Sequence, residues 1–281
     1  MKKISIIIQF SIITIGLFAQ NDFSPAISPN GEKVAFYRYI DKVPQLYIMD
    51  IDGTNLQKIT KFNHLWSIGP IWSSDMSKIY FSHGENMASM DVSTLNLETK
   101  KIIRIKKEGM QFALGECEDE FIWASKENGL KFYASSNSKL EEKKIIDAGV
   151  FKKYWVYVSP SGTFITVNDE GNEGVYLKDS DALKQLIKMK NIQNLSVSKD
   201  GTKMIFEAKV NEIPDIFMAD IDGRNLKNLT RSQSTDYMPS ISPKADFILF
   251  SSNRSGSFCI YKMDLKNNQL SQLTGLVVEK E

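Results

Sequence analysis

Histidine and cysteine are nearly absent from this 281-residue sequence, which contains two of each. Zinc-binding motifs and the metalloprotease pattern His-Glu-x-x-His need clusters of these residues, and the sequence has none. The Gly-x-Ser-x-Gly motif of α/β-hydrolases is also missing. The sequence therefore offers no recognised catalytic or metal-binding motif, although a Ser-His-Asp triad through His64 or His83 stays open.

The sequence also lacks an excess of charge of either sign. Its 35 Lys and Arg residues are balanced by 34 Asp and Glu residues, and both kinds are scattered along the chain. Proteins bind nucleic acids and anionic membranes mainly through clustered positive charge. We therefore expect no nucleic-acid partner and no attachment to an anionic membrane surface.

Only one long apolar run is present, and it lies at the N-terminus. The leader MKK precedes ISIIIQFSIITIGLFA, a run of sixteen residues that is too short for a comfortable membrane span. Leu17 and Ala19 stand at the −3 and −1 positions of a cleavage site, which predicts a signal peptide over residues 1–19 and a mature chain that begins at Gln20. An uncleaved N-terminal anchor is the alternative. We expect a periplasmic or secreted protein with no membrane span after cleavage.

Amphipathic helices are missing too, and short strands rich in Ile, Val, Tyr and Phe take their place, such as KVAFYR, QLYIMD, KIYFSH and KMIFEA. These strands belong to an internal repeat. Residues 50–60, DIDGTNLQKIT, and residues 220–230, DIDGRNLKNLT, share seven of eleven letters at an offset of 170 residues. A catalytic motif is needed once, whereas a building unit recurs, so we interpret the phrase as part of the scaffold.

The repeat divides the chain into six units. Their markers, at spacings of 45, 43, 43, 39 and 44 residues, are Ser28, Ser73, Glu116 in place of a serine, Ser159, Ser198 and Ser242. Four strands in a unit of about 40–50 residues are typical of a propeller blade. The sequence thus predicts an all-β, six-bladed β-propeller of four-stranded antiparallel blades. Residues 20–281 form it as one domain, and each marker serine follows the innermost strand of its blade.

The phrase that begins with Asp50 superficially resembles a calcium-binding loop, because acidic residues alternate in it. An EF-hand loop needs a further ligand at its fifth position and a carboxylate at its twelfth. From Asp50 these positions are Thr54 and Lys61. We therefore interpret the phrase as a tight hairpin turn in which Gly53 supplies a positive φ, and we predict no metal and no cofactor.

The turns SPNG, SPSG and SKDG, together with the ending YxMDxDGxNLxxLT, resemble the propeller repeat of the TolB family. The resemblance covers nearly the whole chain after residue 19. The resemblance is specific in three units and looser in two. In the third unit of the chain only the succession of strands and turns matches. The resemblance implies a six-bladed propeller. TolB has an α/β domain ahead of its propeller, whereas the first unit here begins a few residues after the expected cleavage site, so the resemblance implies a propeller alone and not all of TolB's roles.

A candidate site is expected where the connections between units, together with the loop between the second and third strands of each unit, form one mouth of the central channel. Most aromatic side chains of the strands, such as Phe36 and Trp72, are expected to pack between blades. Others stand just ahead of an innermost strand and beside a polar or charged residue, as in loops that build binding sites on rigid scaffolds. The candidate ligand- or partner-binding residues are Asp22, Phe23, Trp66, Lys153, Tyr154, Asp236, Tyr237 and Arg254.

Two classes of function stay open. The export signal, the repeat and the missing catalytic motifs favour a non-enzymatic binding module of the TolB-propeller type. Its channel mouth would bind a protein or peptide in the cell envelope, or a small ligand. The alternative is a propeller enzyme, a lyase or hydrolase, that uses carboxylates or a metal at the mouth. A role as an accessory part of an envelope assembly rests on analogy of fold alone.

The two cysteines are predicted to remain free thiols. An exported chain with an even number of cysteines would ordinarily form a disulfide. Cys117 falls in the third unit and Cys259 in the sixth, and these units face each other across a ring of six. Their separation would greatly exceed the ~7 Å that a disulfide allows between Cα atoms. We expect Cys259 to be buried as a small apolar residue and Cys117 to be more exposed.

Overall fold

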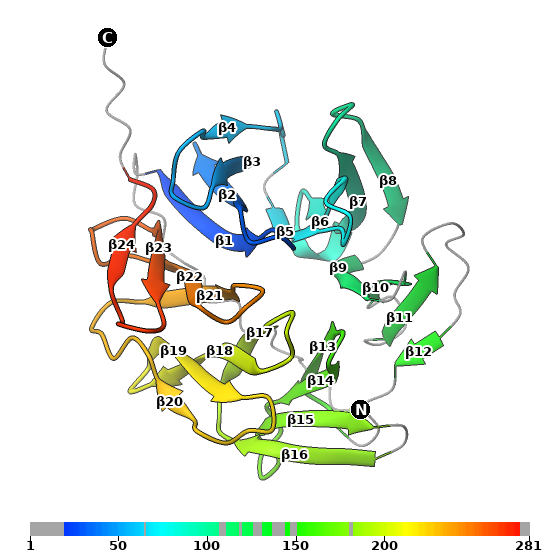
Figure 1. Cartoon of the computed structure of the whole chain (residues 1–281). Helices are drawn as coiled ribbons and strands as arrows, with labels where there is room; N and C mark the ends of the chain where they lie inside the picture. Colours follow the sequence, from blue (N-terminus) through cyan, green and yellow to red (C-terminus); the bar gives the residue numbers. More distant parts are fainter. Residues whose placement is uncertain are drawn as a thin grey trace.

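The protein is a ring of six four-stranded sheets around a common axis (Figure 1). The computed structural model describes residues 20–64, 66–106, 111–117, 120–125, 131–136, 144–146, 151–179 and 182–275. Each sheet is one blade and is built from four strands that are consecutive in the chain. The predicted all-β, six-bladed propeller is therefore confirmed.

The strands of blades one and two are β1 (Asn21–Ile27), β2 (Lys33–Ile40), β3 (Val43–Asp50), β4 (Gln57–Lys58), β5 (Trp66–Trp72), β6 (Lys78–Gly84), β7 (Asp91–Asn96) and β8 (Ile102–Lys106). Those of blades three and four are β9 (Gln111–Cys117), β10 (Glu120–Ser125), β11 (Lys131–Ser136), β12 (Lys144–Ile146), β13 (Tyr154–Ser159), β14 (Gly162–Val167), β15 (Gly174–Asp179) and β16 (Ala182–Lys188). Those of blades five and six are β17 (Ile192–Val197), β18 (Lys203–Val210), β19 (Ile213–Asp220), β20 (Lys227–Asn228), β21 (Asp236–Ile241), β22 (Phe247–Ser252), β23 (Cys259–Asp264) and β24 (Leu270–Gln272).

A single turn of 3-10 helix, η1 (Met87–Ser89), interrupts the strands in the described part of the chain. Nowhere in that part does a helix have the length and apolar composition needed to cross a membrane.

The first strand of each blade is the innermost one. Each of these strands, β1, β5, β9, β13, β17 and β21, contacts the first strand of the next blade, and β21 contacts β1 to complete the circle. The marker serines take the predicted places, because Ser28, Ser73, Ser198 and Ser242 directly follow a first strand and Ser159 ends one. The turns that follow the first strands lie against one another in neighbouring blades, as in the hydrogen bond from the Asp200 N–H to the Pro243 carbonyl, so the first strands begin on the same side of the ring. We call that side the mouth face and the opposite side the turn face.

The marker serine holds the turn that follows the first strand. In blade one the Ser28 hydroxyl donates to Asn30 Oδ1 at 2.7 Å and accepts from the Lys33 N–H at 2.9 Å. Ser73, Ser198 and Ser242 make the same pair of bonds with an acidic residue of their own turns and with the N–H five residues on. A short hydroxyl side chain that satisfies the backbone of its own turn explains why serine recurs there.

The repeated phrase builds the turn between the third and fourth strands. In blade one Asp50 accepts from the Asn55 amide at 2.6 Å and from Lys33 at 2.8 Å. Asp220 has the equivalent partners, Asn225 and Lys203. Because both carboxylates are occupied by groups of their own blades, the phrase is a structural unit, as the sequence predicts.

The glycine of this turn also brings neighbouring blades together. Gly53 and Gly223 both have φ of +89°, a conformation that favours glycine. A Cβ atom on Gly53 would lie 3.0 Å from the carbonyl oxygen of Leu273, which follows the outermost strand of blade six. A Cβ atom on Gly223 would collide with the carbonyl oxygen of Leu186 in β16 of blade four. Glycine therefore lets the turn of one blade approach the backbone of the preceding blade.

The core consists of apolar clusters between blades. Phe36, Phe81, Phe206 and Phe250 occupy the same position of the second strand in four blades, and each is fully buried. Tyr80 stacks on Phe121 of blade three, with ring centroids 4.6 Å apart. These contacts confirm that the strand aromatics pack between blades, where burial of one such side chain stabilises the fold by about 1.5–3 kcal/mol.

The ring closes without exchange of strands. Blade one uses only the first four strands and blade six only the last four. The Asp22 N–H donates to the Phe258 carbonyl at 2.8 Å, and the Phe258 N–H donates to Asn21 Oδ1 at 3.1 Å. Val34, Phe36 and Met49 of blade one share an apolar cluster with Leu249 and Ile260 of blade six. Side-chain packing and these hydrogen bonds therefore seal the ring, a question that the sequence left open.

The thiol of Cys259 is free and buried in an apolar cluster of blades five and six, as predicted. Cys117 is the last residue of β9, and its side chain lies outside those that the structure describes.

Candidate binding site at the mouth face

Four first strands share one irregularity near the mouth face. A β-bulge interrupts the pairing of the first and second strands in blades one, two, five and six. The residues with positive φ in these bulges are Ser24, Gly69, Asn194 and Met238. A bulge bends its strand and redirects the neighbouring side chains, and bulges are frequent beside functional sites. The same β-bulge therefore recurs near the mouth face in these four blades, and the side chains beside it differ from blade to blade.

The structure brings five of the eight predicted site residues together at the junction of blades six and one. Phe23 and Tyr237 both pack against Phe258, with ring centroids 4.7 and 6.0 Å apart. Asp22 belongs to the same group because its N–H donates a hydrogen bond to the Phe258 carbonyl oxygen. Asp236 precedes Tyr237 in β21 and binds the guanidinium of Arg254.

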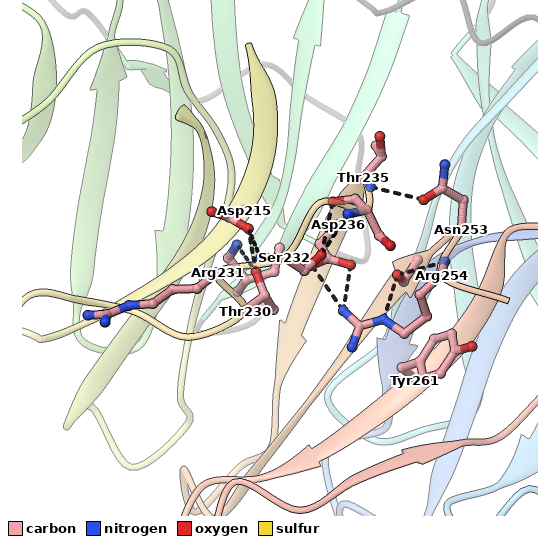
Figure 2. Close-up of polar contacts among 12 residues, drawn as sticks. Asp215, Thr230, Arg231, Ser232, Thr235, Asp236, Asn253, Arg254 and Tyr261 are labelled. Carbon is pink, nitrogen blue, oxygen red and sulfur yellow. Dashed lines mark hydrogen bonds and ion pairs between the residues drawn. The ribbon is translucent and has the colours of Figure 1, made fainter. Parts of the chain in front are cut away.

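The charges in this group are paired inside the protein. The Arg38 Nε and Nη2 atoms donate to the two oxygens of Asp22 at 2.7 and 2.8 Å, and both side chains are buried. Arg254 Nη2 donates to both oxygens of the fully buried Asp236, at 2.9 and 3.0 Å (Figure 2). A buried ion pair is destabilised strongly when one partner is removed. Asp22 and Asp236 therefore hold the inner strands in place, and only the Arg254 side chain is partly open to solvent.

Hydrogen bonds between polar side chains and the backbone also hold the connection from blade five to blade six. Asp215 accepts hydrogen bonds from the Thr230 hydroxyl at 2.9 Å and the Ser232 N–H at 3.2 Å, as Figure 2 shows. The Ser232 hydroxyl in turn donates to Asp236 at 3.2 Å. The path of this connection is thus set by side chains, which gives the mouth face at this junction a defined shape.

The other three predicted residues come from other blades. Trp66 begins β5 and is 39% exposed, the largest exposure of an aromatic side chain in the described residues. Tyr154 begins β13 and packs against Phe132, with ring centroids 5.4 Å apart. Lys153 is exposed, and its N–H donates to Asp169. These three residues lie at the predicted ends of their strands but do not belong to the Phe258 group.

Glu207 is a candidate site residue that the sequence analysis did not name. It pairs with Gln193 at the register position just before the bulge of blade five. The residues at this position in blades one, two and six are Tyr37, Ser82 and Ser251. A carboxyl group at a repeat position that otherwise carries hydroxyl groups is the signal that an alignment of the units would have given.

Glu207 shares one structural task with Ser82, its equivalent in blade two. Its Oε2 atom accepts from the Met238 N–H of the next blade at 2.8 Å, just as Ser82 Oγ accepts from the Ala113 N–H at 2.7 Å. A hydroxyl group performs this task in blade two, so the task does not require a carboxyl group. Burial raises the pKa of Glu207, because removal from water penalises its charged form. A perturbed carboxyl group beside an opening is a candidate for function.

Glu207 borders a shallow depression between blades five and six. The depression is lined by Asn191, Gln193, Glu207, Ala208, Lys209, Pro214 and Tyr237. All of them lie at the mouth ends of β17, β18, β19 and β21. Tyr237 is the predicted site residue that takes part, and the depression combines an aromatic ring with one acidic and one basic side chain.

The two histidines meet at the junction of blades one and two. Their rings lie 4.7 Å apart beside Phe62. Burial, and secondarily the neighbouring His83, lowers the pKa of His64 to about 4, and burial also lowers the pKa of His83. Both rings are therefore neutral at pH 7.

Each histidine contacts a serine but lacks the third member of a triad. His64 Nε2 lies 2.9 Å from Ser67 Oγ, and His83 Nε2 lies 2.8 Å from Ser93 Oγ. Within the described part of the chain no carboxylate is hydrogen-bonded to either ring, and Ser93 is fully buried. The described residues likewise include no group of three or more His, Cys, Asp or Glu side chains that could hold a metal ion. This arrangement suits interior packing more than nucleophilic catalysis.

Comparison with solved structures places the fold among TolB-like propellers. The chain superposes on TolB from Acinetobacter baumannii with a TM-score of 0.74 and 16% identity, over 86% of this chain and 63% of that chain. It superposes on the tricorn protease with a TM-score of 0.71 and 16% identity, over 94% of this chain and 27% of that chain. An oligogalacturonate lyase from Vibrio parahaemolyticus gives a TM-score of 0.56 and 16% identity, over 89% of this chain and 79% of that chain.

Sequence comparison adds little to this. No family model matches the chain. An uncharacterized protein of Agrobacterium fabrum, Atu1656, is 25% identical over 122 residues, which are 42% of each chain. The chain thus spans less than half of this curated relative and 63% of the TolB chain. At such identities the likeness establishes the TolB-like propeller fold, which binding proteins and enzymes share.

Proposed function

We propose that this protein is an exported, non-enzymatic binding module that holds a peptide segment of a partner protein at its mouth face. Residues 1–19 act as the signal peptide, and the propeller works in the periplasm or outside the cell. The observation that carries the proposal is Glu207, a buried carboxyl group at a repeat position where three other blades have hydroxyl groups.

The surroundings of Glu207 support a peptide as the ligand. Tyr237 and Pro214 give the depression an apolar wall, and Gln193 and Asn191 bring amide groups that pair with a peptide backbone. Lys209 adds a positive charge at the rim, 4.0 Å from Glu212. The buried Asp236–Arg254 pair keeps this side of the site rigid, which reduces the entropy lost on binding.

Affinity purification tests the proposal. Tagged wild-type protein from the periplasm of its own host is compared with the variants Glu207→Gln and Tyr237→Ala by mass spectrometry of the proteins that co-purify. Glutamine retains an oxygen that can accept from the Met238 N–H, so this variant should fold while losing the charge. We expect a partner whose recovery falls about tenfold or more in either variant, as for a central contact residue.

Two controls make the result specific. Lys184→Ala changes an exposed residue of β16, the outermost strand of blade four, which does not line the depression, and should leave the recovery unchanged. Tyr154→Ala should have a smaller effect than Tyr237→Ala, because Tyr154 does not line the depression. Recovery of the same partner by both folded site variants contradicts the proposal.

N-terminal sequencing of the periplasmic protein should begin at Gln20, and an intact Met1 would contradict the signal peptide.

The raised pKa of Glu207 also favours a second candidate, a propeller lyase or hydrolase. A carboxyl group with a raised pKa is suited to general acid–base catalysis near neutral pH. Among the propellers of similar fold, one is an oligogalacturonate lyase and another is the tricorn protease. Turnover of an acidic oligosaccharide or a peptide that is abolished by Glu207→Gln, with binding retained, would favour this enzyme over the binding module.

A further inference from the structure

The outermost strand of blade two, β8, differs from the other outer strands by its exposed apolar side chains. Ile102 is 42% exposed and Ile103 is 51% exposed. Among residues whose exposure the structure describes, no other outer strand has a large apolar side chain this exposed. The outer strand β16 of blade four shows the usual pattern, in which Leu183, Leu186 and Ile187 turn inward. Consecutive residues of a strand point to opposite faces of the sheet, so each face presents one exposed isoleucine at this edge of blade two.

Within the described residues, the outer edge of β8 has no strand paired to it. β8 pairs there with β7 alone, and residues 98–104 are all exposed. The outer edge of such a strand presents unpaired N–H and C=O groups to solvent. The equivalent strands of blades one and five, β4 and β20, have only two residues each, so they offer a far shorter edge.

Basic side chains surround the two isoleucines. Lys100 and Lys101 precede them and Arg104 follows, and all three are exposed. In the described residues Asp91 lies 3.2 Å from Arg104 and pairs with it, and Glu98 is a further exposed acidic residue two positions before Lys100. Two copies of β8 that paired with each other would bring these positive charges together, which opposes self-association. A strand with acidic and apolar residues would instead be matched in both charge and hydrophobicity.

We infer that β8 is a second docking surface, on which an extended acidic and apolar segment of another protein adds as a fifth strand to blade two. Backbone hydrogen bonds along β8 supply the affinity, and contacts with Ile102 and Ile103 on the two faces of the sheet supply the register. The surface is separate from the mouth face, so the inference does not depend on the proposed function of Glu207.

Peptide binding tests the inference on the full mature chain. The probe is a fluorescent peptide of about nine residues with alternating Glu and Val, and its counterpart has Lys in place of Glu. We expect the acidic peptide to bind with a dissociation constant on the order of 10–100 µM, at least ~10-fold tighter than the basic peptide, and to weaken as salt is added. Hydrogen exchange should slow at the amides of residues 101–106.

Variants locate the binding. The double change Lys100→Glu, Lys101→Glu should reverse the preference between the two peptides. Ile103→Thr keeps the tendency to form a strand and should weaken binding of the acidic peptide several-fold through lost apolar contact. Lys184→Glu on β16 is the matched control and should change neither affinity. Glu207→Gln and Tyr237→Ala should also bind as the wild type does, because they lie in a different blade and at the mouth.

Several results would overturn the inference. They are equal affinity for both peptides, no binding of the acidic peptide, protection of amides elsewhere than in β8, and a charge reversal on β8 that leaves the preference unchanged. Loss of peptide binding in Glu207→Gln would move the docking surface to the mouth face. Any of these outcomes would leave Lys100, Lys101 and Arg104 as charges that only protect a free edge.

Discussion

The substitution Gly223→Ala should weaken the junction between blades four and five. Gly223 has φ of +89°, and a Cβ atom there would collide with the carbonyl oxygen of Leu186 in β16. Two costs therefore add up. A residue with a side chain at positive φ costs about 1–2 kcal/mol. Forcing the turn away from β16 costs about 1–3 kcal/mol more, as overpacking does in a core. The expected loss of unfolding free energy is about 2–5 kcal/mol.

The chain contains its own controls for the two costs. Gly171 has nearly the same φ, +86°, but a Cβ atom there meets nothing within 4 Å, so Gly171→Ala should show the conformational cost alone. Gly53 is intermediate, because its Cβ atom would lie 3.0 Å from the Leu273 carbonyl oxygen. The predicted order of destabilisation is Gly223→Ala, then Gly53→Ala, then Gly171→Ala.

Urea unfolding followed by tryptophan fluorescence measures this order, provided that each variant unfolds in one transition with an unchanged m-value. If Gly223→Ala and Gly171→Ala lose the same free energy within about 0.5 kcal/mol, the turn does not dock on β16, and the explanation of the repeated phrase is wrong.

Three further predictions concern pH and ring closure. The pKa of His64 is lowered from 6.5 to about 4 in the folded protein. The stability that this residue contributes above pH 6.5 is therefore lost as the pH falls toward 4, by about 1–2 kcal/mol after allowance for solvent. Urea midpoints measured against pH should show this loss in the wild type and not in His64→Phe. The raised pKa of Glu207 has the opposite sign, so stability present below pH 4.5 is lost as the pH rises through the folded pKa, whereas Glu207→Gln should lack this dependence in the same assay. Phe258→Ala removes the ring that packs against Phe23 and Tyr237 and should lower the unfolding free energy by about 3–5 kcal/mol, and a loss below 1 kcal/mol would mean that the ring is closed by other contacts.

Part of the candidate site could be predicted because the repeat shows where strands begin. Phe23, Trp66, Tyr154 and Tyr237 all lie at or near the start of a first strand, as expected from their place before each marker serine. Their partners could not be predicted in the same way. Tyr237 reaches Phe258, which comes from the loop between the second and third strands of blade six, and only packing decides which loop residues meet a strand end.

The charged residues show the limit most clearly. Asp22 and Asp236 read in the sequence as groups available to a ligand, yet both are buried in pairs with Arg38 and Arg254. Glu207 reads as an interruption of an apolar strand, yet it borders the depression. Whether a carboxyl group is paired inside or offered to solvent depends on which side chains approach it from other strands.

The sequence by itself determined the local and periodic features of this protein. Strand composition, the serine turns and the Asp-Gly turns depend on residues a few positions apart, and their recurrence sets the number of blades. The tertiary structure decided what happens between blades. Met238 donates to Glu207 across 31 positions, and Phe258 meets Asn21 across 237. Such contacts arise from the packing of whole sheets against one another. The same packing closes the ring and buries His64 and Glu207, and this burial shifts their pKa values.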